Sequence, residues 1–424
     1  MSRRKITSTI IIAAGLAVTL TLAACSSSGG GEENGGGETA QGVTADTIKI
    51  GLFGPMSGNA AVYGKGINTI AAMYEEINAN GGINGRQIEL IIEDDECAGD
   101  TARLAITKLI QQDKVFMLHG GECSGAVKAA MPLIKESGIP YLIAGAADHA
   151  LVSPPTKNVF HGWADNTSGT NADMEFVTSY AKQNGGSVKI AVVTQADDWG
   201  KGWTKSFKEA LKESGKGDSV EIVKEISLAP DTTDATAQVQ SVKSADVDLA
   251  VVYAYPDPMS VFLRNKSQQG LDIPVITGQG TFPEDQLDRL GSPEAVGKFF
   301  SAYCMADTLD SKALAPFKEA TAKYYPKDTF DLSSMLGATG VPVNEQILTN
   351  LGDDLTWDSW IAQAETIKDF EAGAAQPISY GPYDESDPNT RLGVTTCQLA
   401  YLDEKDPKGG IAVIAPDWSE WVNR

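Results

Sequence analysis

The sequence predicts an α/β protein with two Rossmann-like lobes, each built around a parallel sheet. Short β-branched runs alternate with amphipathic helical stretches along most of the chain, which is the pattern of βαβ units. The alternation starts again after about Trp163. Roughly 380 residues follow the N-terminal segment, which is beyond the size at which a single hydrophobic core stops growing. We therefore expect two lobes.

The first series of elements predicts four strands and three helices. Its first helix ends at Gly81 and Gly82, because glycine accepts the positive φ that terminates helices. The expected strands are 48–52, 88–92, 115–118 and 140–143, and the expected helices are 66–80, 101–112 and 125–137.

The second series repeats this pattern before a helical segment and a short tail. The expected strands are 189–194, 220–226, 249–253 and 274–277, and the expected helices are 171–184, 202–214, 236–244 and 259–270. Residues 307–376 are predicted to be mainly helical, and 394–402 and 410–414 are further strand candidates. We assign residues 46–164 and 307–377 to lobe 1, and residues 165–306 and 378–424 to lobe 2.

The N-terminus predicts a lipoprotein signal peptide over residues 1–24. Basic residues at positions 3–5 precede an apolar run of residues 10–22, which is shorter than the roughly 20 residues of a membrane span. The run ends in Leu22-Ala23-Ala24-Cys25, so Cys25 is the expected lipidation site. An ordinary signal peptide followed by a chance cysteine is the alternative. Residues 25–45 are rich in Gly, Ser and Glu and are predicted to form a flexible tether.

The charge of the chain limits its partners. The formal net charge is −22, and removal of residues 1–24 takes away three positive charges and no acid, which gives −25. This acidity excludes nucleic-acid binding through phosphates. It also excludes electrostatic attachment to an anionic membrane, so we expect membrane contact through the lipid on Cys25 only. We expect an extracytoplasmic monomer, lipid-anchored to the outer face of the cell membrane, without a cofactor.

Four cysteines remain besides Cys25: Cys97, Cys123, Cys304 and Cys397. An even number in an exported protein favours disulfides, and four cysteines allow three pairings. No C-x-x-C spacing occurs, so neither a zinc site nor a redox site is expected.

Two strand-to-helix loops of the first lobe are candidate binding loops, because ligands of open α/β sheets bind beyond the carboxyl ends of strands. Residues 54–64 include Ser57 and Tyr63, and their glycines allow a ligand to approach the backbone. The loop is not a phosphate-binding P-loop, because its glycine spacing is one residue too long and Lys65 precedes a glycine. In the second loop, 119–126, Ser124 either binds a carboxylate or only caps the following helix.

Further loops in similar places follow later strands. Residues 145–148, which include Ala147 and Asp148, have small side chains near a third strand end. In the second lobe, Trp199, Tyr255 and Gln279 lie in the loops 197–200, 255–257 and 278–281. The tryptophan either covers a ligand or only packs.

The order of several segments resembles the leucine/isoleucine/valine-binding family of ABC-importer solute receptors. These segments are "IKIGLFGPMSG", "INANGGINGRQIELIIEDDECAGD", "LHGGECSG", "SGIPYLIAGAADHAL", "NVFHG", "ADDWGKGWTKSFKEALK" and "SYGPYDESDP". The resemblance implies a type I periplasmic-binding fold with a three-segment hinge. It also implies delivery of a small polar solute, such as a branched-chain amino acid, an amide or a carboxylate, to importer permease subunits by lobe closure.

The resemblance also implies roles for single residues. Ser124 falls where the family holds a ligand carboxylate, and residues 145–148 fall on its second carboxylate loop. Tyr63, Trp199 and Tyr255 fall on or near aromatic positions that wall the ligand. The pairing Cys97–Cys123 matches a disulfide of some members, which leaves Cys304–Cys397, both on strand candidates of the second lobe.

One position departs from the family pattern. Its amino-acid binders place a glutamate that meets the ligand ammonium where this chain has Gln279, and a neutral amide cannot neutralise a buried cation. Either Asp257, Glu122 or Asp148 takes that role, or the ligand lacks an ammonium group.

Two other function classes compete with solute capture. An exported hydrolase is disfavoured, because neither Ser57 nor Ser124 stands in G-x-S-x-G and the three histidines, at positions 119, 149 and 161, lack metal-ligand spacing. We therefore expect no enzyme. A ligand-sensing lipoprotein that signals to a membrane partner is the remaining alternative.

Overall fold

The computed structural model describes residues 40–58, 60–305, 311–373, 375–402 and 411–414. The predicted signal peptide, Cys25 and the tether up to residue 39 lie outside the described residues. Within these ranges, no helix has both the length and the hydropathy needed to cross a bilayer.

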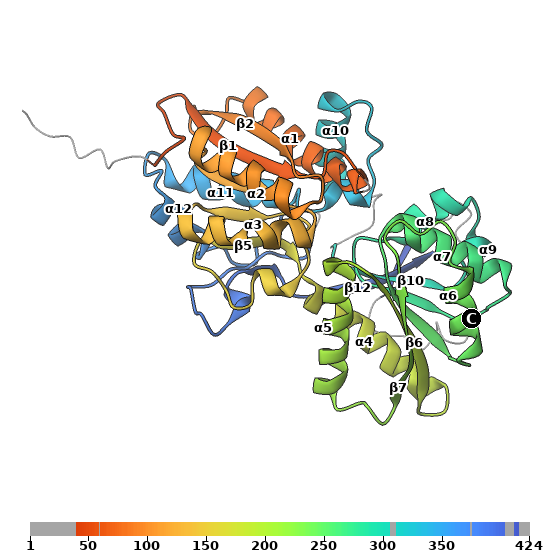
Figure 1. Ribbon diagram of the computed structural model, residues 1–424. Coiled ribbons are helices and arrows are strands. Elements are labelled where there is room, and N and C mark those ends of the chain that lie inside the picture. The colour runs from red at the N-terminus through yellow and green to blue at the C-terminus, as the bar shows by residue number, and fades with distance from the viewer. Residues whose placement is uncertain (1–39, 59, 306–310, 374, 403–410, 415–424) are drawn as a thin grey trace, which may run out of the picture. The chain divides into compact units, whose positions relative to one another are not determined.

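The first sheet has six strands in the order β11-β5-β4-β3-β1-β2, and every neighbouring pair is parallel. Three of these strands, β1, β2 and β5, are labelled in Figure 1. Its central strands are buried along their whole length, which is why they are short apolar runs. The strands are β1 (Thr47–Gly54), β2 (Gln87–Asp94), β3 (Met117–Gly120), β4 (Tyr141–Ile143), β5 (Val159–Ala164) and β11 (Leu392–Val394).

Helices cover both faces of this sheet. A Cβ at Gly51 of β1 would contact Leu109, whereas one at Gly54, three residues along, would overlap Ile67 on the opposite face. The helices are α1 (Gly64–Ala79), α2 (Gly99–Thr107), α3 (Ser124–Ser137), α10 (Ala315–Tyr324), α11 (Gly340–Leu351) and α12 (Trp357–Ala364), with short turns η1 (Ala61–Tyr63), η2 (Lys108–Gln112), η3 (His149–Leu151), η4 (Lys312–Leu314), η5 (Leu332–Met335) and η6 (Pro388–Thr390).

The second sheet has seven strands in the order β13-β12-β10-β9-β8-β6-β7. Five of them are parallel, and β12 and β13 add an antiparallel edge. The strands are β6 (Val188–Gln195), β7 (Val220–Leu228), β8 (Leu249–Tyr253), β9 (Val275–Thr277), β10 (Phe299–Tyr303), β12 (Gln398–Leu402) and β13 (Ile411–Ile414).

Two separate hydrophobic cores cover the faces of the second sheet. Ile190 and Val192 of β6 pack into one core, and Ala191 and Val193 pack into the other, as the two-residue period of a strand requires. The first core holds α4 (Asn166–Gln183) and α5 (Asp198–Ser214), and the second is covered by α6 (Thr236–Ser244), α7 (Pro256–Gln268), α8 (Pro283–Leu290) and α9 (Pro293–Val296).

The two sheets share one topology. The orders β2-β1-β3-β4-β5 and β7-β6-β8-β9-β10 both reverse direction beside their first strand, between β1 and β3 and between β6 and β8. The chain passes between the sheets three times: from β5 to α4, from β10 to α10, and from β11 to β12. The predicted fold of two parallel-sheet lobes with a three-segment hinge is confirmed.

The structure corrects the predicted tail. The strand candidate 394–402 is two strands, because residues 395–397 form the third passage between the sheets. β11 pairs with β5 of the first sheet, so the assignment of all residues from 378 onward to lobe 2 is wrong for β11. The remaining lobe boundaries stay a prediction.

Two buried strands, β5 and β10, contain polar residues within their apolar sequence, and these residues form hydrogen bonds inside the protein. In β5, one ring nitrogen of His161 bonds the carbonyl oxygen of Ala146 at 2.7 Å, and the other accepts the backbone N–H of Trp163 at 3.2 Å. In β10, the Ser301 hydroxyl donates to the carbonyl oxygen of Gly278 at 3.2 Å. The local sequence of each strand does not predict these hydrogen bonds, because most of the partners lie in other loops.

Both disulfide predictions are confirmed. Cys97 is bonded to Cys123, which ties the loop after β2 to the loop after β3. Cys304 is bonded to Cys397, and these residues directly follow β10 and directly precede β12. The second bond therefore links two of the three passages between the lobes.

Candidate functional site

The candidate binding loops lie at the points where the order of each sheet reverses. The loops after β1 and β3 flank the reversal in the first sheet, and the loops after β6 and β8 flank the reversal in the second. Such reversal points form the crevices in which open α/β sheets bind ligands. The strand order thus brings the predicted loops of each lobe together.

A small cavity of about 10 Å³, the space of about one water molecule, lies among these loops. Five of the eight predicted binding residues line it: Tyr63, Ala147, Trp199, Tyr255 and Gln279. Its other lining residues are Glu122, Gly145, Gly280 and Leu336. Both lobes contribute to the cavity wall.

Three aromatic side chains form one continuous part of the wall, called here the aromatic cluster: Tyr63, Trp199 and Tyr255. The ring centroids of Tyr63 and Tyr255 are 5.3 Å apart in an edge-to-face arrangement, and those of Trp199 and Tyr255 are 5.0 Å apart. Burial raises the pKa of both tyrosines well above its ordinary value, so both are neutral phenols.

Trp199 lies on a helix and not in a loop as expected. Helix α5 begins at Asp198, because the Asp197 side chain accepts the backbone N–H of Gly200 and caps it. The prediction started this helix at residue 202. The earlier start fixes the indole on the first turn of α5, where it packs against Trp203 with ring centroids 5.9 Å apart.

Ser124 lies outside the cavity lining and is fully buried. The N-cap residue of α3 is Cys123, without a side-chain capping bond, so the interpretation of Ser124 as a cap is wrong. Its hydroxyl instead accepts the backbone N–H of Asp148 at 3.2 Å. Ser124 therefore joins the two predicted carboxylate loops of the first lobe.

Ser57 also lies outside the cavity lining. Its hydroxyl donates to the Asp94 carboxylate at 2.6 Å, and the backbone N–H groups of Met56 and Glu96 donate to the same carboxylate at 2.9 Å. Burial raises the pKa of Asp94, but these hydrogen bonds outweigh it and the pKa is lowered. In this structure Ser57 fixes the shape of its loop.

Gln279 uses both ends of its amide within the protein. Its oxygen accepts the indole N–H of Trp163 at 2.7 Å, and its nitrogen donates to the carbonyl oxygen of Ala164. Only 2% of the residue is exposed. The side chain thus ties the loop after β9 to the first passage between the lobes.

Two of the three acids proposed to replace a family glutamate are already neutralised. Asp257 is exposed and forms an ion pair with Arg289. Asp148 forms an ion pair with Lys128 at 2.5 Å and also accepts the backbone N–H of Ala150. Neither lines the cavity.

The third acid, Glu122, differs from both. It lines the cavity, is 5% exposed, and neither carboxylate oxygen has a hydrogen-bond partner. Burial and the nearby Asp95 raise its pKa well above its ordinary value, and the Gly145 backbone amide lowers it only in part, without a bond of normal geometry.

The loop before Glu122 can only be built from glycine. Gly120 and Gly121 have φ values of 123° and 82°, and a Cβ on either would overlap neighbouring atoms. These two residues turn the chain out of β3 so that Glu122 reaches the cavity. Leu336 was not predicted, because it follows η5 far along the chain and carries no local signal.

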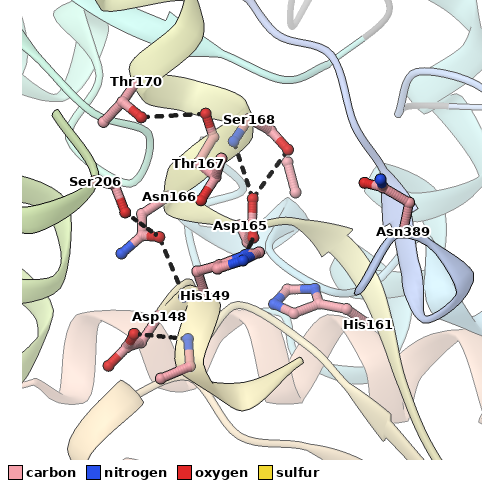
Figure 2. A network of polar contacts seen from close by, with 12 residues as sticks. Asp148, His149, His161, Asp165, Asn166, Thr167, Ser168, Thr170, Ser206 and Asn389 are labelled. Atoms are coloured by element: carbon pink, nitrogen blue, oxygen red, sulfur yellow. Dashed lines mark hydrogen bonds and ion pairs between the residues drawn. The ribbon is translucent and has the colours of Figure 1, made fainter. Parts of the chain in front are cut away.

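A polar network surrounds the first passage between the lobes (Figure 2). His149 Nδ1 lies 2.5 Å from Asp165 Oδ2, and Asp165 Oδ1 accepts the backbone N–H of Ser168 at 2.9 Å as the cap of α4. The Ser168 hydroxyl also lies 3.2 Å from the carbonyl oxygen of Val394, at the third passage.

Asn166 extends this network into the second lobe. Its side-chain oxygen accepts the backbone N–H of His149 at 3.1 Å and the hydroxyl of Ser206 on α5 at 3.0 Å. Burial works to lower the pKa of His149, but the hydrogen bond and charge of Asp165 outweigh it and raise this pKa. The hydrogen bonds of this network therefore connect the two lobes.

None of the three histidines lines the cavity, and among the described residues no three His, Cys, Asp or Glu side chains are grouped to hold a metal ion. His119 contacts Tyr74 at 3.0 Å, and burial lowers its pKa to about 3, which leaves it a neutral core residue.

Comparison with known proteins agrees with this geometry. The sequence profile of the periplasmic binding protein family matches residues 47–405. Leu/Ile/Val-binding protein homolog 7 of Brucella abortus is 26% identical over 369 residues, which cover 83% of this chain and 88% of that protein. A leucine-, isoleucine-, valine-, threonine- and alanine-binding protein of Pseudomonas aeruginosa is 28% identical over 240 residues, 56% of this chain and 62% of its own length.

Solved structures share the fold. The branched-chain amino acid binding protein LivJ of Streptococcus pneumoniae, in complex with isoleucine, has a TM-score of 0.71 at 24% identity, covering 87% of this chain and 99% of its own. A solute binding protein of Rhodopseudomonas palustris, in complex with 3,4-dihydroxybenzoic acid, has the same score and identity and covers 87% of this chain and 97% of its own.

Proposed function

The chain belongs to the periplasmic binding protein family, and from this premise we propose that it is an extracytoplasmic receptor that captures a small polar solute for an ABC importer. The relatives are named as binding proteins, and none of those described above is named as an enzyme. We propose that the chain performs no catalysis of its own and works as a monomer.

One observation carries this proposal. The cavity at the reversal points of the two sheets is lined by five residues of the first lobe and four of the second. A ligand held there contacts both lobes at once. The three passages of the chain between the lobes allow one lobe to move against the other, so binding energy can favour the closed arrangement.

The proposed mechanism is capture by closure. The solute first binds against the loops of the first lobe. The second lobe then brings Trp199 and Tyr255 over it and excludes water, and the permease subunits recognise the closed form. Of the predicted contacts, we propose Tyr63, Ala147, Trp199, Tyr255 and Gln279 as direct ligand neighbours, with Ser57, Ser124 and Asp148 holding the loops behind them.

We further propose that the lipid on Cys25 anchors the receptor, with residues 25–45 as its tether. The support is the lipobox-like Leu-Ala-Ala-Cys sequence. Expression of the full chain with Cys25→Ser should move the protein from the membrane fraction to the soluble fraction. Membrane retention of this variant would contradict lipid anchoring.

A thermal-shift screen tests the proposed function. The panel holds amino acids, amides, aromatic acids and polyols. A ligand present at 100 times its Kd should stabilise the protein by about 2.7 kcal/mol. If no solute in the panel raises the melting temperature, solute capture of these classes is wrong.

A further inference from the structure

Glu122 is a buried carboxyl group that the fold leaves without a partner. Both oxygens are inaccessible and lack a hydrogen bond, and the residue lines the cavity. A buried polar group without a partner costs about 1–3 kcal/mol, and more if it is charged. Native structures keep few such groups, so this one calls for an explanation from function.

The surroundings of Glu122 are shaped to hold its carboxyl group. A Cβ at Gly145 would overlap Oε2, and one at Gly66 would stand 3.0 Å from Oε1. The disulfide from Cys123 to Cys97 fixes the residue that follows. The two glycines leave the space that the carboxyl group occupies, and the disulfide holds the next residue in place. The fold therefore fixes the position of Glu122.

The lining of the cavity contains one acid and no base. None of its nine lining residues is Lys, Arg or His, and Glu122 is the one acid among them. Asp95, fully buried behind it, adds further negative charge and has one unpartnered oxygen. Lys128 of α3 is already paired with Asp148, and Arg289 of α8 is already paired with Asp257.

The aromatic cluster supplies the second half of a cation site. Tyr63, Trp199 and Tyr255 line the same cavity as Glu122. Aromatic faces attract a cation within about 6 Å, and aromatic cages combined with a carboxylate are a common way to hold an alkylammonium group. A carboxylate ligand placed here would meet no basic residue.

We infer that this cavity holds the positively charged group of the solute, with the aromatic cluster as its walls and with Glu122, which releases its proton when the solute binds, as its counter-ion on the first lobe. The inference rests on the proposed function and specifies its ligand: an alkylammonium-bearing solute, such as a zwitterionic amino acid. It also accounts for Gln279. This side chain is hydrogen-bonded to Trp163 and Ala164 at the first passage between the lobes, and the charged group of the solute is recognised by Glu122 on the opposite lobe.

The test uses matched probes and the intact mature protein. Each amino acid of a panel is compared with its carboxylic acid lacking the amino group and with its amine lacking the carboxylate; for leucine these are 4-methylpentanoate and 3-methylbutylamine. Calorimetry should find ligands only among the probes that carry the ammonium group. The compounds without it should bind at least about 30-fold more weakly.

A variant series locates the counter-ion. Glu122→Gln keeps the size of the side chain and should weaken the best ammonium ligand about 30-fold or more. Asp257→Asn removes an exposed, ion-paired acid outside the cavity and should leave affinity within about 2-fold. The wild-type probe comparison does not depend on the folding of any variant.

The outcomes separate the inference from the function on which it rests. Tight binding of a compound without an ammonium group, or unchanged affinity in a folded Glu122→Gln protein, overturns the cation site while solute capture stands. Absence of binding by every probe, including amides and polyols, overturns solute capture itself.

Discussion

The hydroxyl of Tyr63 donates a hydrogen bond to the backbone carbonyl oxygen of Gly280 at 3.2 Å. Tyr63 belongs to the turn after β1 in the first lobe, and Gly280 follows β9 in the second. The bond therefore joins the lobes directly at the wall of the cavity, beside the aromatic cluster.

Tyr63→Phe should weaken solute binding by about 2- to 10-fold. The change keeps the ring and removes one interlobe hydrogen bond, which contributes about 0.5–1.5 kcal/mol. Calorimetry with the best solute from the screen measures the effect. Tyr324→Phe, which removes an exposed hydroxyl that contacts Glu75, is the control. Equal losses in both variants would argue against a special role for the Tyr63 bond.

Glu122→Gln should stabilise the empty protein, and more so at pH 8 than at pH 5. The raised pKa means that the folded protein holds a proton after the unfolded chain has lost it. The free energy of unfolding of the wild type therefore falls as pH rises from the carboxyl pKa of the unfolded chain toward that of the folded protein. The amide of the variant does not titrate, so the variant does not lose this stability. Urea unfolding at both pH values should show a gain of about 1–3 kcal/mol at pH 8. A variant less stable than wild type at both pH values would contradict an unpaired carboxyl.

Gln279→Glu should destabilise the protein by about 2 kcal/mol without creating an ammonium site. The new carboxylate would place an oxygen against the carbonyl oxygen of Ala164, which now accepts a hydrogen bond from the amide. Thermal unfolding and calorimetry measure the two effects. Unchanged stability together with tighter amino-acid binding would show that residue 279 can serve as the ammonium site.

His149→Gln should remove a stabilising ion pair that depends on pH. The raised pKa of His149 means that its contribution is complete below the ordinary histidine pKa and is lost as pH rises through the folded value. The wild type should thus exceed the variant in stability by about 1 kcal/mol at pH 5.5, and this difference should shrink by pH 8.5. A difference that is constant with pH would mean that the pair is not charged.

Removal of the Cys97–Cys123 disulfide should affect both stability and binding. The bond closes a sequence separation of 26 residues, for which chain entropy predicts a loss of about 3–4 kcal/mol. The Cys97→Ser/Cys123→Ser protein should also bind its solute more weakly, because Glu122 precedes Cys123. The Cys304→Ser/Cys397→Ser protein is the matched comparison for stability. Full affinity in the first variant would show that the cross-link does not position the loop.

Sequence periodicity predicted most of the fold because parallel strands buried on both faces are apolar runs. It missed β5 and β10, where His161 and Ser301 are satisfied by contacts with distant loops. It also joined β11 and β12 into one strand, because no local signal marks a passage between two sheets in residues 395–397.

The site was predictable in position and less so in detail. The loops at strand ends and the family resemblance placed Tyr63, Trp199 and Tyr255 at the cavity wall. They could not show that the amide of Gln279 is bound by Trp163 and Ala164, or that the Ser124 hydroxyl serves Asp148. Those assignments depend on partners 24 to 116 residues away in the chain.

Small-angle scattering of the mature protein, with and without a solute that raises its melting temperature, tests capture between the lobes most directly. The account predicts a smaller radius of gyration at saturation, as Trp199 and Tyr255 close over the solute bound at Glu122. An unchanged radius of gyration, at a solute concentration where calorimetry shows full occupancy, would contradict it.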